Sequence, residues 1–119
     1  MNDRILVLDG EEKLRNRYQH ELQALGYQVI TAGDSRIALE KIKCGSVDLV
    51  IMDLELPDGS GFDCLERLMS LRRQVKVVIN TTDASYKEDF HSWIADAFLM
   101  KSADLNELTH TVNDILQPN

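Results

Sequence analysis

Four polar side chains that could act together in one reaction each lie at the end of an apolar run. Asp9 and Asp53 supply carboxylates, Thr81 a hydroxyl and Lys101 an ammonium group. A carboxylate can act as a nucleophile toward a phosphoryl group, and carboxylates are also the hard oxygen ligands that Mg²⁺ prefers. A hydroxyl donor and a lysine would then stabilise the charge on the phosphoryl oxygens. The four residue types therefore predict phosphoryl transfer to Asp53, with Mg²⁺ held beside it.

Asp53 is the strongest of these candidates, because it interrupts the apolar stretch "LVIMDLEL". A buried carboxylate is costly unless it is paired or bound to a metal. The other three have ordinary explanations when taken singly. Asp9 could be only a turn or helix-cap residue, Thr81 is unremarkable in a strand, and Lys101 could be a solvated end residue. Their joint occurrence at the ends of different apolar runs is what predicts a site.

The apolar runs that carry these residues are typical of strands buried on both faces of a parallel sheet. They are rich in Val, Ile and Leu, and most lack strict alternation. The expected strands span residues 5–8, 29–31, 49–54, 75–79 and 97–100. The third of these includes Asp53 near its end.

Helical patterns separate the runs and predict five helices. The first ends at Gly26 and the second near Gly45. The fourth begins at Ser85, where "SYKE" is a capping box, and the fifth near Asp104, where "DLNE" is another. Apolar positions at helical spacing include Leu14, Tyr18, Leu22 and Leu25 in the first helix, Ala38, Leu39 and Ile42 in the second, Cys64, Leu65, Leu68 and Met69 in the third, and Phe90, Trp93 and Ile94 in the fourth. Five such β-α units predict an α/β fold with a doubly wound five-stranded parallel sheet, whose sites form at the carboxyl ends of the strands.

Composition excludes several classes of partner. The chain has 119 residues, 44% of them hydrophobic, and a net charge of −7. An acidic protein of this kind is not expected to bind nucleic acid directly, and no apolar run approaches membrane-spanning length. The N-terminal apolar run is too short for a signal peptide. We therefore expect one cytoplasmic domain, residues 1–119, in which Cys44 and Cys64 are reduced thiols.

The segment "MDLELPDGSGFD" resembles the phosphoacceptor loop of the response-regulator receiver domains of two-component signalling (CheY-like). Pro57 follows Asp53 by four residues and Thr81 follows it by 28, as in that family. Phe98 lies three residues before Lys101, where the family has a switch aromatic. The resemblance covers nearly the whole chain. It implies a flavodoxin-like (βα)5 fold with strand order 2-1-3-4-5.

The resemblance also implies roles for these residues. Asp53 would accept a phosphoryl group from the phosphohistidine of a sensor histidine kinase or a phosphotransfer protein, and Thr81 and Phe98 would form the switch. Lys101 would pair with the acidic cluster and then with the phosphoryl group. Mg²⁺ would be bound by Asp9, Asp53 and the backbone carbonyl of Glu55. The face made by helix 4, strand 5 and helix 5 would bind a downstream protein target or an attached output domain, and it offers a route to a homodimer.

Gly10 departs from the family pattern. Receivers usually have a second acidic residue here, which is a direct Mg²⁺ ligand. Losing even an outer partner of a metal ligand typically costs ~10–100-fold in affinity, so Mg²⁺ binding should be weakened. Water, Glu11 or Glu12 could fill the position, or the site could work without Mg²⁺. Acids in a first helical turn are also explained by the helix dipole.

A second departure follows Lys101, where Ser102 replaces the family's usual proline. The Lys101–Ser102 bond should therefore be trans, because a cis bond without proline is costly. Ser102 and Asp104 are both candidate caps at the entrance of the fifth helix. Lys101 should still reach Asp53, because its strand places it before the departure begins. Trp93 is expected either to pack on a helix face or to contact a partner.

Three functions remain open at this point. The chain could be a phosphorylated switch, which is not an enzyme beyond self-phosphorylation from phosphodonors and self-dephosphorylation. It could be a pseudo-receiver that binds partners independently of phosphorylation, which Gly10 favours. It could also be a small phosphatase with Asp53 as nucleophile and Glu55 as second acid, although no cap domain or substrate pocket is evident.

Overall fold

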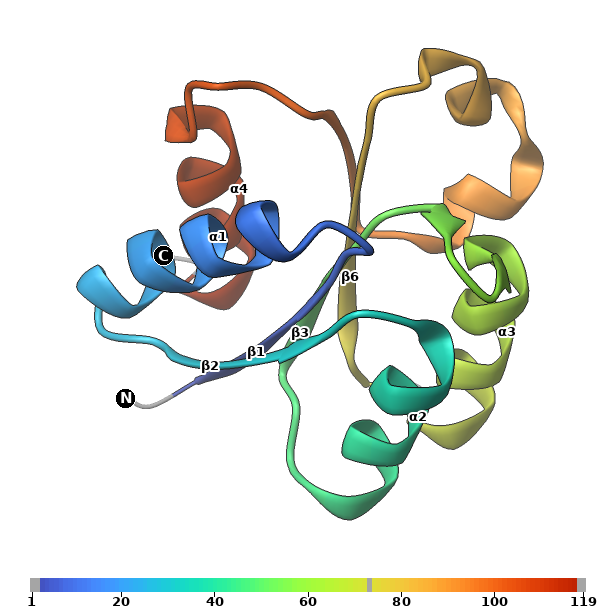
Figure 1. Cartoon of the computed structure of the whole chain (residues 1–119), viewed down its shortest axis with the longest axis horizontal. Coiled ribbons are helices and arrows are strands. Elements are labelled where there is room, and N and C mark those ends of the chain that lie inside the picture. The colour runs from blue at the N-terminus through green and yellow to red at the C-terminus, as the bar shows by residue number, and fades with distance from the viewer. Residues whose placement is uncertain (1–2, 73, 118–119) are drawn as a thin grey trace.

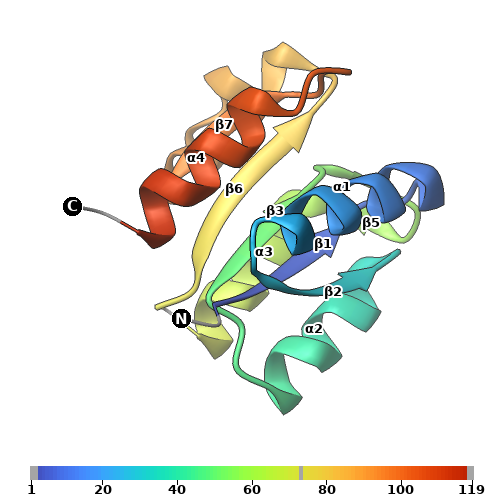
Figure 2. The same cartoon turned by 90° about the vertical axis from the view of Figure 1, so that its left-hand side faces the viewer.

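The five apolar runs form one parallel sheet in the computed structural model, which describes residues 3–72 and 74–117. The strands are β1 (Arg4–Leu8), β2 (Gln28–Ala32), β3 (Leu49–Met52), β6 (Lys76–Thr81) and β7 (Ala97–Met100). Their order across the sheet is β2-β1-β3-β6-β7, with every neighbouring pair parallel (Figure 1 for β2, β1, β3 and β6; Figure 2 for β7). When only these five strands are numbered along the chain, their order is 2-1-3-4-5, as predicted. The labels β4 (Glu55–Leu56) and β5 (Gly59–Ser60) belong to a small antiparallel hairpin.

The strand ends differ slightly from prediction at the residues that matter for the site. β3 stops at Met52, so Asp53 lies directly after it rather than inside it. The Asp53 N–H still donates to the Leu8 carbonyl at 3.0 Å, which keeps its backbone in line with the sheet. β6 extends to Thr81, two residues further than predicted. These ends lie along one edge of the sheet, as parallel strands require.

Within the part of the chain that the structure describes, four α-helices cover the two faces of the sheet. They are α1 (Glu12–Ala24), α2 (Ser35–Cys44), α3 (Gly61–Leu71) and α4 (Asn106–Leu116). α1 and α4 lie on one face, and α2 and α3 lie on the other (Figures 1 and 2). Within the described residues, no helix has the length and apolar character needed to cross a membrane.

The sheet separates two apolar clusters. One packs the side chains of α2 and α3 against residues such as Leu6, Val50 and Ile79. The other packs Tyr18 and Leu22 of α1 and residues of α4 against the opposite face. Most predicted core positions lie in these clusters. Leu25 does not: it follows the last residue of α1 and is 47% exposed, just before Gly26 turns the chain with φ +99°.

The prediction of an α-helix from Ser85 is wrong. Two 3-10 helices, η1 (Ala84–Glu88) and η2 (Phe90–Ile94), connect β6 to β7. Asp83 rather than Ser85 caps the first, because its carboxylate accepts the Ser85 N–H at 2.9 Å. Trp93 and Ile94 are 76% and 47% exposed, so these apolar residues do not face a core. A short helix without a packed apolar face gains little from the α conformation.

The two cysteines differ in a way that predicts a pH dependence of stability. Cys64 is buried in α3, and this burial raises the pKa of its thiol from 9.0 to about 11. The unfolded thiol ionises near its ordinary pKa, while the folded thiol keeps its proton until about pH 11. The stability that depends on the neutral thiol is therefore complete below pH 9.0 and falls, by roughly 2–3 kcal/mol, as the pH rises through the folded pKa.

Urea unfolding followed between about pH 8 and 11 should show this difference. Cys64→Ala should flatten the alkaline fall in the free energy of unfolding. Cys44→Ala is the matched control, because Cys44 is exposed at the end of α2 and its removal should leave the slope unchanged. Parallel slopes in wild type and Cys64→Ala would show that the buried thiol does not contribute.

Candidate functional site

Three of the four predicted side chains meet at the carboxyl ends of the strands. The Lys101 Nζ lies 2.8 Å from Asp9 Oδ2 and 2.7 Å from Asp53 Oδ2. The side chains of Lys101, Asp9 and Asp53 are only 8%, 4% and 10% exposed. Asp9 follows β1, Asp53 follows β3 and Lys101 follows β7, so three strands position one buried cluster of charges. The prediction that Lys101 reaches Asp53 is confirmed.

The second oxygen of each carboxylate is held by the turn that follows its strand. Asp9 Oδ1 accepts the Glu11 N–H at 2.9 Å. Asp53 Oδ1 accepts the Glu55 N–H at 3.2 Å. Each aspartate thus uses one oxygen to form a local turn and offers the other to Lys101. This arrangement fixes both carboxylates before any ligand arrives.

Lys101 is charged in this cluster. Burial by itself lowers the pKa of its ammonium group, but hydrogen bonds to Asp53 and Asp9 and the attraction of both carboxylates outweigh burial, and the net shift is upward. The cluster of two carboxylates and one ammonium carries a formal charge of −1. Since the pKa is raised in the folded state, the stabilisation is complete below the ordinary lysine pKa and is lost as the pH rises through the folded value.

The backbone after Lys101 follows a trans peptide bond to Ser102, as the replacement of proline predicts. The Ser102 Oγ accepts the Asp104 N–H at 3.1 Å, and Asp104 Oδ1 accepts the Asn106 N–H at 2.9 Å. Both side chains therefore bind backbone N–H groups in the turn before the helix, but the prediction that they cap it is wrong, because the N-cap residue is Leu105 and no side chain caps the helix there. The helix itself begins two residues after Asp104, at Asn106.

Thr81 and Phe98 lie on the face of the sheet that α2 and α3 cover. Thr81 is fully buried at the end of β6, and its carbonyl accepts the Lys101 N–H at 2.8 Å. Its Oγ1 accepts the Asp83 N–H at 3.4 Å. Phe98 is paired with Ile79 across β7 and β6 and packs against the same cluster. Side chains alternate along a strand, so Thr81 faces the same side of the sheet as Ile79, two residues earlier. Phe98, which pairs with Ile79, faces that side too.

The oxygen atoms at this edge suit Mg²⁺ better than a softer metal. Two carboxylates converge, and Mg²⁺ is commonly bound through one or two carboxylates while it retains several waters. No group of three or more His, Cys, Asp or Glu residues that could hold a metal ion occurs within residues 3–72 and 74–117. Glu11 and Glu12 are exposed and do not complete such a group with Asp9 and Asp53.

Gly10 is exposed and does not have a positive φ angle. The strain that an aspartate would suffer at a left-handed glycine therefore does not arise here. A Cβ at Gly10 would lie 3.2 Å from Cδ and 3.3 Å from Cγ of Pro57, which is close but not prohibitive. Only a shift of a few tenths of an ångström in the Pro57 ring is needed to admit a side chain.

Gly10→Asp should therefore raise the Mg²⁺ affinity by ~10–100-fold, because it adds a third carboxylate to the cluster. The same change should lower the stability of the metal-free protein, since the added charge faces two carboxylates and only one ammonium. Calorimetric Mg²⁺ titration and urea unfolding measure the two effects. Gly10→Asn, which has the same shape without the charge, is the matched control and should show no affinity gain. Equal affinity in wild type and Gly10→Asp would mean that water or another group already fills the position.

Two further interactions near the site were not predicted from sequence. Arg15 of α1 donates from Nη1 to the Asp9 carbonyl at 2.7 Å. Asn80, buried next to Thr81, donates from Nδ2 to the Tyr18 hydroxyl at 3.1 Å. The Asn80 amide inside the apolar run "VVIN" was the one available signal for the second contact. No sequence signal indicated the Arg15 contact, because an arginine in the first turn of a helix is common on a solvent-exposed face.

Comparison with known proteins identifies a family that this chain resembles over most of its length. Residues 5–113 match the family model described as the response regulator receiver domain. The alkaline phosphatase synthesis transcriptional regulatory protein PhoP of Bacillus subtilis is 30% identical over 122 residues, which cover 98% of this chain and 50% of that protein. The chain spans about half or less of the length of the curated relatives it matches.

Two of the similar solved structures match nearly the whole chain. The response regulator protein TrrA of Thermotoga maritima, in complex with Mg²⁺-BeF, is 36% identical with a TM-score of 0.91, over 96% of this chain and 99% of that one. TrrA in complex with the histidine kinase ThkA is 36% identical with a TM-score of 0.89, over 97% and 99% of the two chains.

Proposed function

Because the chain belongs to the response regulator receiver domain family, whose members are signalling switches of two-component systems, we propose that it is switched by phosphorylation of Asp53. The donor is the phosphohistidine of a sensor histidine kinase or of a phosphotransfer protein. A related receiver is seen in complex with a histidine kinase, which supports this class of partner. We further propose that residues 1–119 act as a single receiver domain in the cytoplasm.

The observation that carries the proposal is the buried Lys101 bridge between Asp9 and Asp53. In the transfer, an oxygen of Asp53 forms a bond to phosphorus while the bond from phosphorus to the donor imidazole breaks. The imidazole nitrogen leaves with the electron pair of that bond, and Asp53 needs no proton because it reacts as a carboxylate. Lys101 supplies a fixed positive charge beside the acceptor oxygen, and Thr81 supplies a hydroxyl donor one strand away.

Asp9, Asp53 and the backbone carbonyl of Glu55 are the groups that would hold Mg²⁺. When bound, the metal neutralises charge on the transferring phosphoryl group. Mg²⁺ accompanies the phosphoryl mimic BeF in the related TrrA structure. In this chain Asp9 is already oriented by its Glu11 N–H bond, so at the end of β1 the metal would meet one preset carboxylate, where the family usually provides two adjacent acidic residues.

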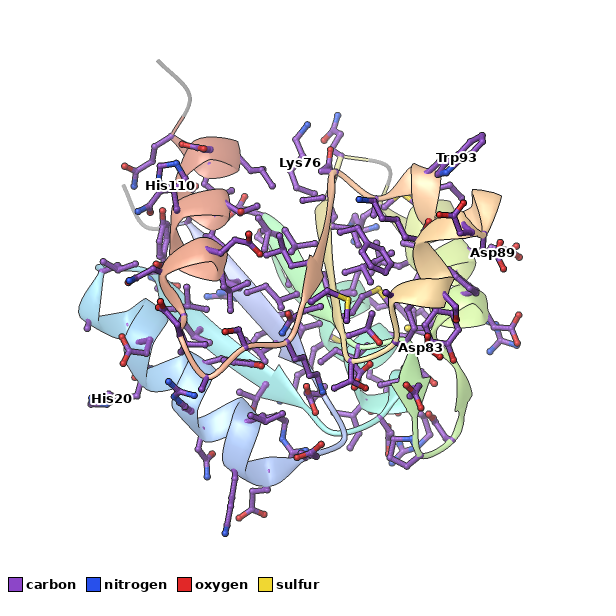
Figure 3. The ribbon with its side chains drawn as sticks, turned by 90° about the horizontal axis from the view of Figure 1, so that it is seen from above. His20, Lys76, Asp83, Asp89, Trp93 and His110 are labelled. Atoms are coloured by element: carbon purple, nitrogen blue, oxygen red, sulfur yellow. The ribbon has the colours of Figure 1, made fainter. Side chains whose placement is uncertain are left out.

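The switch would act through Thr81 and Phe98 on the surface formed by η1, η2, β7 and α4, which corresponds to the predicted face of helix 4, strand 5 and helix 5. Among the described side chains of η2 and β7, three large apolar ones are exposed: Trp93, Ile94 and Met100. Figure 3 shows Trp93 directed away from the body of the protein. This surface is proposed to bind a downstream protein, an attached output domain or a second copy of the chain, with phosphorylation shifting its population between two states.

Incubation of the purified chain with a small phosphodonor and Mg²⁺, followed by intact mass measurement, tests the proposal. The expected result is one added phosphoryl group that is lost on removal of the donor. A chain that stays unmodified at high Mg²⁺ would favour the second candidate, a pseudo-receiver that binds partners independently of phosphorylation. Gly10 is the observation that favours that candidate.

A further inference from the structure

Asp9 is held at its backbone as well as at its side chain. Its N–H donates to the Ala32 carbonyl of β2 at 3.1 Å, and its own carbonyl accepts from Arg15 Nη1 at 2.7 Å. The Arg15 backbone N–H is itself bonded to the Glu11 carbonyl at 3.0 Å, in the first turn of α1. Arg15 therefore reaches back over its own helix terminus to the peptide group that joins Asp9 to Gly10.

Gly33 provides the space for this reach. It follows β2, next to Ala32, and its φ angle is not positive. A Cβ built at Gly33 would lie 3.1 Å from Nη1, 3.4 Å from Cζ and 3.7 Å from Nη2 of Arg15. All three of its nearest neighbours thus belong to the Arg15 guanidinium group. The absence of a side chain at Gly33 leaves the guanidinium in place against Asp9.

The contact matters because the residue after Asp9 is a glycine. A glycine restrains the adjoining peptide less than any other residue, so the Asp9–Gly10 peptide has unusual freedom to rotate. The Glu11 N–H that binds Asp9 Oδ1 belongs to the following peptide, so a rotation of the Asp9–Gly10 peptide that carries the downstream chain with it would release the carboxylate. The Arg15 guanidinium opposes this by binding the carbonyl of that same peptide.

We infer that Arg15 is a positioning residue for the phosphorylation site, and that the absence of a side chain at Gly33 leaves room for its guanidinium group. Arg15 touches neither reacting atom; it acts through the Asp9 backbone to keep the Asp9 carboxylate facing Asp53 and Lys101. This inference rests on the proposed function for its role in phosphorylation, but its effect on metal binding is measurable without any phosphodonor.

The test uses Mg²⁺ alone as the probe, with calorimetric titration of the full chain. Arg15→Met keeps the aliphatic stem and removes the guanidinium, and about a tenfold loss of Mg²⁺ affinity is expected. Gly33→Leu should produce a similar loss, because its side chain displaces the guanidinium. The double variant should be no worse than Arg15→Met alone, since both changes break one contact.

Arg17→Met is the matched control. Arg17 lies on the same helix and also donates to a backbone carbonyl, that of Ala103 in the loop after Lys101 rather than that of Asp9. The Arg17→Met variant should bind Mg²⁺ with the affinity of wild type. Arg15→Lys restores a cation of shorter reach, so its Mg²⁺ affinity should lie between those of wild type and Arg15→Met. If Arg15→Met does not fold, Arg15→Lys and Gly33→Leu still test the inference.

A phosphodonor assay separates positioning from a general structural effect. Arg15→Met should raise the Mg²⁺ concentration needed for half-maximal phosphorylation about tenfold while the rate at saturating Mg²⁺ changes little. Wild-type Mg²⁺ affinity in folded Arg15 and Gly33 variants, or a loss no larger than that of Arg17→Met, would overturn the inference. Failure of wild type to be phosphorylated, with Mg²⁺ affinity still dependent on Arg15, would instead count against the proposed function alone.

Discussion

Asp53→Asn should abolish phosphorylation of the chain, which is the largest effect that we expect from any single substitution. An amide has no anionic oxygen to attack phosphorus, whereas it keeps the shape of the carboxylate and can still accept the Glu55 N–H. Lys101 retains Asp9 as a partner at 2.8 Å, so the fold should tolerate the change. Intact mass after incubation with phosphodonor and Mg²⁺ should show no modified protein.

Asp9→Asn is the informative comparison for this experiment. Asp9 is as buried as Asp53 and contacts the same lysine, so the two variants perturb the cluster similarly. The Asp9 variant should still be modified, at a reduced rate and with a greater demand for Mg²⁺. Modification that survives in Asp53→Asn but disappears in Asp9→Asn would show that the phosphoacceptor is Asp9 and that our proposal names the wrong aspartate.

Lys101→Met should destabilise the protein by about 3–5 kcal/mol at neutral pH. The change leaves two carboxylates buried beside each other without the ammonium that both now contact. Urea unfolding at neutral pH measures the loss.

Two companion variants identify the cause of that loss. Lys76→Met removes an exposed lysine at the start of β6 and should change the free energy of unfolding by less than about 0.5 kcal/mol. Combining Lys101→Met with Asp53→Asn removes one of the two opposed charges and should recover much of the stability. A double variant as unstable as Lys101→Met would show that packing of the lysine stem, rather than charge, accounts for the effect.

Sequence patterns predicted the sheet and the site well, because both depend on features that are local in the chain. A run of Val, Ile and Leu indicates a buried strand, and a polar residue at its end is automatically placed at the sheet edge once the strands are parallel. Asp9, Asp53 and Lys101 could be brought together by that reasoning alone. The strand order required the family resemblance, since nothing local in the sequence fixes which strand pairs with which.

The errors share a different physical cause, which is dependence on contacts that sequence spacing does not reveal. The capping pattern at Ser85 suits an α-helix, but Asp83 takes the capping role, and Trp93 and Ile94 find no core to pack against. Arg15 was overlooked because its bond to Asp9 depends on the room left by Gly33. A long side chain that spans two loops is not visible in helical periodicity.

The pair of 3-10 helices between β6 and β7 has a consequence for how the molecule opens. Hydrogen bonds of the i→i+3 type have poorer geometry than those of an α-helix, so η1 and η2 have less to lose when they separate from the sheet. Amide hydrogens in this segment should exchange with solvent through local openings, while those of the central strands β1 and β3 exchange only when the whole chain unfolds. A partner that orders this segment must offset the conformational entropy that the segment loses on binding. The complex is therefore weaker and dissociates more readily.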